Sequence, residues 1–114
     1  MTQPLQEPTF LILAALAGEP MHGYGVIPEV VALSGGRVTL RPGTLYGALD
    51  RLVEQGLVAA DREEVVDGRL RRYYRLTENG AGTLEAEAKR LTSNAEAAVE
   101  RLRRRSSRVR LAHG

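Results

Sequence analysis

Small, polar and basic residues gather in the stretch Arg41–Gly47, which contains a proline, two glycines, a threonine and a tyrosine. Pro42 suits the first position of a helix, so a helix is predicted to start here, where unpaired amide groups carry partial positive charge. Such an end favours a bound phosphate. Gly47 lets another backbone come close, and the hydroxyls of Thr44 and Tyr46 can bond to a phosphate or a base edge. The chemistry predicted for this stretch is therefore phosphate binding.

Arginine is concentrated in two further places. Arg69, Arg71 and Arg72 follow the pair Asp67-Gly68, a strong signal for the tip of a β-hairpin. Guanidinium groups there can lie along a nucleic-acid backbone or enter a minor groove, although Arg72 is as well explained by an ion pair with Glu63. The second place is the run from Arg103 to Arg110, which either ends a helix in solvent or forms an arm that contacts DNA.

The sequence offers little for catalysis or for metal binding. The 114 residues include no cysteine and only two histidines, His22 and His113, and no acidic pair brackets His22 at ligand spacing. We therefore predict no enzyme activity, no cofactor and no metal. The apolar run Phe10–Ala17 is shorter than the ~20 residues of a membrane helix and lacks the basic start of a signal peptide. A cytoplasmic protein without a membrane partner is expected.

The net charge of only +2 conceals a segregated distribution. Residues 1–36 carry −3, residues 37–80 carry +1 and residues 81–114 carry +4. A chain that segregates its arginines in this way remains a candidate for binding a polyanion, even though its total charge is small.

Three helices are predicted in the first half of the chain. The first spans Thr9–Ala17 with Thr9 as its cap, and it is apolar on nearly all sides. The second spans Gly23–Leu33, and residues 37–40 then form a connector or a brief strand. The third runs from Pro42 to about Gln55. Apolar residues at helical spacing are expected to face the core from the second and third helices: Val26, Val30, Leu33, Leu45, Leu49, Leu52 and Val53.

Two strands and a long helix are predicted in the second half. The strands span Leu57–Val66 and Arg69–Leu76, and a two-residue turn between them places an acid opposite a base in two pairs, Glu64 with Arg71 and Glu63 with Arg72. Thr77 is predicted to cap a helix that runs to about Arg105.

The last predicted helix carries a heptad seam, whose apolar residues recur at alternating intervals of four and three: Leu84, Ala88, Leu91, Ala95, Ala98 and Leu102. The preceding elements are too small to cover so long a helix. A second copy of the chain is therefore expected to cover the seam, which predicts a homodimer.

Together these elements predict a mainly α (α+β) fold, a winged helix-turn-helix with a long C-terminal dimerisation helix. The predicted parts are a DNA-binding domain over residues 1–76, a dimerisation helix over residues 77–105 and a disordered basic tail over residues 106–114.

Three stretches in this order resemble the PadR family of bacterial transcriptional regulators. They begin at His22-Gly23-Tyr24-Gly25, at Pro42-Gly43-Thr44-Leu45-Tyr46 and at Asp67-Gly68-Arg69, and the resemblance covers about residues 8–105. It implies a homodimeric winged-helix repressor with a C-terminal helix for dimerisation. We therefore predict a repressor that binds a pseudo-palindromic operator in double-stranded DNA and is released by an unknown small-molecule effector. By position, the resemblance implies DNA contacts from Tyr24, Thr44, Tyr46 and Gly47 on the helices and from Arg69 and Arg71 on the wing.

The chain departs from that family in two respects. Arg41 stands where members often have serine, which removes a helix cap worth on the order of 1 kcal/mol and adds a cation at the DNA end. The chain also has no tryptophan, which argues against drugs stacked between aromatic rings. Two alternatives remain for the function: a ligand or metal sensor, and a protein-interaction adaptor on the same scaffold.

Overall fold

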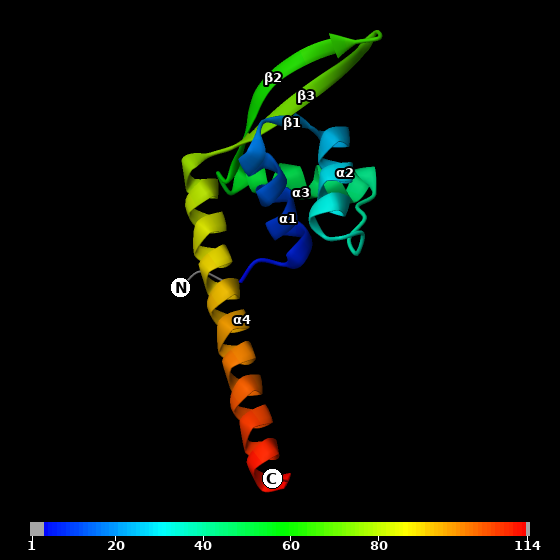
Figure 1. The fold of residues 1–114 in the computed structure, drawn as a ribbon. Helices are drawn as coiled ribbons and strands as arrows, with labels where there is room; N and C mark the ends of the chain where they lie inside the picture. Colours follow the sequence, from blue (N-terminus) through cyan, green and yellow to red (C-terminus); the bar gives the residue numbers. More distant parts are fainter. Residues whose placement is uncertain (1–3, 114) are drawn as a thin grey trace. The chain divides into compact units, whose positions relative to one another are not determined.

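The computed structural model describes residues 4–113, which form four helices and three strands. In chain order these are α1 (Glu7–Gly18), β1 (Met21–His22), α2 (Gly23–Leu33), α3 (Pro42–Glu54), β2 (Val58–Val66), β3 (Arg69–Leu76) and α4 (Glu78–His113). The chain divides into two compact units, of which the first ends at Leu84 and the second begins at Glu85, within α4. In the first unit the β2–β3 hairpin projects beyond α1, α2 and α3 (Figure 1).

α1 begins two residues earlier than predicted. Pro8 lies in its first turn, where a missing N–H leaves no helical bond unmade, and Gln6 occupies the cap position without a side-chain hydrogen bond. Thr9 therefore lies inside the helix, and the prediction that it caps α1 is wrong. Residues on several sides of α1 are buried, as expected for a helix that is apolar nearly all round: Leu11, Ile12, Leu13, Ala15 and Leu16.

α2 has the predicted bounds, and α3 ends one residue before the predicted position. Most of the apolar residues predicted to face the core are buried: Val26, Val30, Leu45, Leu49 and Leu52. The prediction is wrong for Leu33 and Val53, which are 47% and 41% exposed. Leu33 is the last residue of α2, and Val53 lies about 80° around the helix from Leu45, at the margin of the buried face.

The sheet contains a strand that the sequence pattern did not predict. Its order is β1-β3-β2, and β1 pairs antiparallel with β3 through Met21 opposite Tyr74 and His22 opposite Tyr73. Residues 37–40, for which a connector or a brief strand was predicted, form the connector between α2 and α3. Two residues are too few to show the alternation by which a strand is predicted.

Near its turn, the hairpin has the predicted register. Glu63 lies opposite Arg72 and Glu64 opposite Arg71. Asp67 and Gly68 both have positive φ angles, 51° and 75°, as a two-residue turn of the favoured hand requires. This turn fixes which wing side chains share a face.

The core of the first unit lies among α1, α2, α3 and the base of the hairpin. Its most deeply buried side chains are Ile12, Leu13, Val26, Val30, Leu45, Leu49 and Val58. Because α3 is anchored through its buried face, its first turn is left at the surface, with Arg41 and Thr44 exposed.

α4 begins at the predicted cap. The Thr77 hydroxyl oxygen accepts a hydrogen bond from the Gly80 amide at 3.0 Å, and the hydroxyl donates to the Gly56 carbonyl at 2.7 Å. The helix continues through His113, eight residues past the predicted end at Arg105, so the basic segment predicted to be disordered is helical as far as that residue. Gly114 lies outside the described residues.

The seam residues of α4 differ in their surroundings. Leu84 packs against the core of the first unit. Farther along, Leu91 and Leu102 are exposed, as are Ala95 and Ala98. A second copy that covers these residues remains a prediction.

Candidate nucleic-acid interface

The first turn of α3 presents an uncapped helix end. Arg41 holds the cap position in an extended conformation, without a side-chain hydrogen bond to the helix. Its carbonyl accepts the first helical bond, from the Leu45 amide at 2.9 Å. The amides before Leu45 have no helical partner, and the turn is exposed, so it suits a negatively charged ligand.

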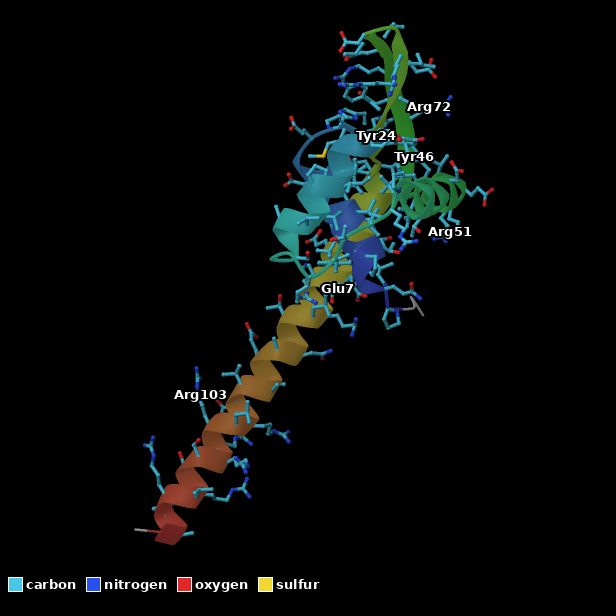
Figure 2. The ribbon with its side chains drawn as sticks, turned by 90° about the vertical axis from the view of Figure 1, so that its right-hand side faces the viewer. Glu7, Tyr24, Tyr46, Arg51, Arg72 and Arg103 are labelled. Atoms are coloured by element: carbon cyan, nitrogen blue, oxygen red, sulfur yellow. The ribbon has the colours of Figure 1, made fainter. Side chains whose placement is uncertain are left out.

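Two tyrosines stand side by side at this end. The rings of Tyr24, on the first turn of α2, and Tyr46, on α3, meet edge to face with centroids 6.0 Å apart. Figure 2 shows them next to each other, with Arg72 of the wing above. Burial, and then the neighbouring Tyr24 and Tyr74, raise the pKa of Tyr46. The Tyr46 hydroxyl therefore keeps its proton at neutral pH and can donate it in a hydrogen bond to a phosphate.

The glycines of α3 are not explained by packing within the chain. A Cβ added at Gly43 would meet nothing within 4 Å, and one added at Gly47 would meet only the far end of the Arg51 side chain, at 3.8 Å. Both sit on an exposed or half-buried stretch beside Thr44. The space that these glycines leave open is available to a partner.

The three wing arginines differ in how their charge is balanced. Nε of Arg72 donates to Oε1 of Glu63 at 3.3 Å. This is the ion pair that was predicted as the alternative to a DNA contact from Arg72. Glu64, opposite Arg71, is instead bonded to Arg62. Among the described residues, Arg69 and Arg71 form no ion pair, and both are exposed. Arg69 and Arg71 therefore retain their charge for a partner.

A groove of about 420 Å³ joins the wing to the helix starts. It is lined by His22, Tyr24, Tyr46, Arg69, Leu70, Arg71 and Arg72. It thus brings together five of the eight residues predicted to contact DNA, while Arg41, Thr44 and Gly47 lie outside its lining, on α3. His22 and Leu70 were missed as groove residues. His22 begins the first stretch that resembles the PadR family, two residues before Tyr24, but as a site residue it was considered only for catalysis or metal binding.

The groove offers hydroxyl, imidazole and guanidinium groups and no carboxylate, so it suits an anion. Across residues 4–113, no cluster of three His, Cys, Asp or Glu side chains is placed to hold a metal ion. In the same part of the chain, no helix is both long enough and apolar enough to cross a membrane.

An exposed helix start and an arginine-bearing hairpin on one groove define a winged helix-turn-helix DNA-binding protein. A family model described as "Transcriptional regulator PadR-like family" matches residues 12–86. The chain belongs to this family and is a DNA-binding transcriptional regulator. The predicted resemblance to the PadR family is thereby confirmed.

Two curated relatives differ in length. Transcriptional regulator Rv3488 of Mycobacterium tuberculosis (strain ATCC 25618 / H37Rv) is 40% identical over 80 residues, which cover 70% of this chain and 71% of that protein. An uncharacterized 37.1 kDa protein in transposon TN4556 of Streptomyces fradiae is 45% identical over 78 residues, 68% of this chain. The chain spans only 21% of the length of the Streptomyces protein.

Solved structures confirm the predicted winged-helix fold. A PadR family transcription regulator from hypervirulent Clostridium difficile R20291 has a TM-score of 0.70 at 23% identity, covering 85% of this chain and 99% of that one. Bacillus subtilis PadR in complex with operator DNA has a TM-score of 0.64 at 20% identity, covering 73% and 47%.

Gly23→Ala is expected to weaken DNA binding about tenfold. The added Cβ would meet the Tyr46 hydroxyl and lie 2.5 Å from its Cζ, so the ring must leave its place beside Tyr24. A loss of ~1.4 kcal/mol of binding free energy corresponds to that factor. Gly25→Ala is the control, since its Cβ would meet the His22 ring no closer than 3.4 Å. Anisotropy titrations of labelled DNA from the upstream region of the gene give both affinities. Equal affinity for Gly23→Ala and wild type would show that the place of Tyr46 is unimportant.

Proposed function

We propose that the chain is a homodimeric repressor that binds a pseudo-palindromic operator in double-stranded DNA and leaves it when a small-molecule effector binds. The observation that carries this proposal is the groove between the helix starts and the wing, with two exposed arginines outside the ion pairs of the wing on one side and two tyrosines on the other. A DNA backbone that follows this groove would meet positive charge and hydroxyl donors together.

α3 and the wing have different tasks in this proposal. The start of α3, with Arg41, Thr44, Tyr46 and Gly47, enters the major groove, supported by Tyr24 of α2. Arg69 and Arg71 bind the flanking DNA backbone. Arg72 also attracts that backbone, but more weakly, because Glu63 partly neutralises its charge. The DNA complex of Bacillus subtilis PadR, a protein of similar fold, supports this use of the fold.

The division of the chain follows from the same proposal. Residues 1–76 form the DNA-binding domain, residues 77–105 the dimerisation helix, and residues 106–114 a basic end beyond it. Two copies joined along the seam of α4 would present two helix starts to one face of the duplex. Their half-sites are expected about 10 bp apart, or a multiple of that, because each turn of DNA returns the major groove to the same face.

A titration of the protein against DNA from its own upstream region tests the proposal. A discrete complex at moderate salt, resistant to excess unrelated DNA, is expected. Binding that is equally tight to unrelated DNA, or absent, would remove the operator-binding repressor from consideration. A transcription assay with the same promoter then measures whether occupancy lowers transcript yield.

Arg69→Ala is expected to weaken binding to all sequences alike and to reduce the slope of log K against log salt by about 1, because one phosphate contact is lost. Arg37→Ala is the matched control. It removes the same charge from an exposed arginine that pairs with Glu7, outside the groove lining. The measurement is operator affinity at four salt concentrations. A change in sequence preference for Arg69→Ala would mean that the wing reads bases and that its assigned role is wrong.

A further inference from the structure

The hairpin that forms the wing is interrupted by a β-bulge. Pairing is regular from the turn to Glu63 opposite Arg72, and it resumes at Ala60 opposite Tyr74. Asp61 and Arg62 of β2 therefore stand opposite Tyr73 alone. Such a bulge bends the strand and increases its twist. The direction in which the arginine-bearing tip leaves the fold is thus set at Asp61 and Arg62.

Arg62 holds the bulge through three contacts. Its Nε donates to Oε1 of Glu64 at 2.9 Å, and its Nη1 donates to Oδ2 of Asp61 at 3.0 Å. The same guanidinium lies over the ring of Tyr73 on β3, with Cζ 3.9 Å from the ring centroid. A planar guanidinium can make two directed hydrogen bonds and stack at once, which an ammonium cannot do.

Tyr73 carries the contact onward to the helices. Its ring meets the ring of His22 edge to face, with centroids 5.4 Å apart, and the two residues are also paired between β3 and β1. His22 is the cap residue of α2, whose first turn carries Tyr24 against Tyr46. A continuous series of contacts therefore runs from the bulge of the wing to the helix starts that line the groove.

We infer that Arg62 is a positioning residue for DNA binding: by stacking on Tyr73 it holds the wing tip at the angle from which Arg69 and Arg71 reach the backbone while α3 is in the major groove. This inference rests on the proposed role of the wing. Arg62 is not assigned a DNA contact, because two carboxylates already balance its charge. The hydrogen bond from Arg62, and then the one from Tyr73, lower the pKa of Glu64. The Glu64 carboxylate therefore stays ionised at neutral pH and keeps its contact with Arg62.

Arg62→Lys tests the inference, because lysine preserves the charge but cannot reproduce the stack and the two hydrogen bonds. We expect about a tenfold loss of operator affinity and a smaller salt slope, although the net charge is unchanged. Arg75→Lys is the matched control: it alters an exposed arginine of the partner strand β3 that also faces Asp61, with its Nε 3.9 Å from Oδ1 of that residue. The control is expected to bind as wild type does. Unchanged affinity and slope for Arg62→Lys would overturn the inference.

A second measurement needs no DNA. Amide ¹⁵N relaxation is expected to show order parameters for residues 63–72 falling toward about 0.6 in Arg62→Lys, with the helices unchanged. Tyr73→Leu should produce the same loosening, and the double variant should lose no more affinity than the more affected single variant. An equally rigid wing in Arg62→Lys would overturn the inference. Failure of wild-type protein to bind the operator would instead count against the proposed function, and the relaxation data would still decide whether Arg62 holds the wing.

Discussion

Gly80→Ala is expected to lower the free energy of unfolding of the first unit by about 2–3 kcal/mol, a cost typical of severe overpacking. A Cβ at this position would overlap the Leu57 carbonyl oxygen and lie 2.7 Å from Cδ1 of Leu76. The carbonyl cannot simply move aside, because it accepts the Thr77 amide at 3.1 Å, while Thr77 bonds to Gly56 and caps α4. The substitution therefore strains the junction between α3, β3 and α4.

The matched control lies two residues away in the same helix. A Cβ at Gly82 would meet nothing within 4 Å, so Gly82→Ala should stabilise the protein by about 0.5–1 kcal/mol through higher helix propensity. Thermal and urea unfolding measure both variants, and a melting temperature about 10–20 °C lower is expected for Gly80→Ala alone. Equal stability of the two variants would mean that the contact between Gly80 and Leu57 is not tight in solution.

The fold could be predicted closely wherever a local signal sets the geometry. Asp67-Gly68 fixes a two-residue turn and with it the register of the hairpin from the turn to Glu63, and Pro42 and Gly56 mark the limits of α3. β1 could not be predicted, because its two residues become a strand only through pairing with β3, which lies about 50 residues further along the chain. The bulge at Asp61 and Arg62 could not be predicted either, because the residue patterns of both strands are continuous there.

The candidate site could be predicted in its composition but not in its connections. Tyr46, Arg69, Arg71 and Arg72 were identified from residue type and position, and Tyr24 from the resemblance to the PadR family. The groove brings all five together. The pairing of Glu64 was less predictable: cross-strand register places it opposite Arg71, yet its carboxylate bonds to Arg62 on its own strand. Register predicts which residues lie opposite a side chain. At the bulge, however, Arg62 lies over Tyr73, and Glu64 pairs with Arg62 instead of with Arg71.

Leu102→Asp is expected to abolish the proposed dimer and to reduce operator affinity at least 100-fold. Leu102 is 60% exposed in the single chain and belongs to the predicted seam, so a dimer would bury it twice. The dimer would lose the burial of two leucines, at ~1.5–3 kcal/mol each, and would bury two carboxylates in their place. This free-energy cost is larger than a helix pair of this length can offset. Two half-site contacts that are no longer joined lose the high effective concentration that links them.

Leu111→Asp is the control for this prediction. Leu111 is 82% exposed on the same helix, but it lies on the side opposite the seam, so the same change of side chain should leave the dimer intact. Sedimentation equilibrium and operator titration are measured for both variants. The expected result is a monomer with weak binding for Leu102→Asp only. A dimer that survives this change would place the subunit interface elsewhere. A Leu102→Asp monomer that still binds the operator tightly would show that one copy suffices for recognition, and the pseudo-palindrome would lose its physical basis.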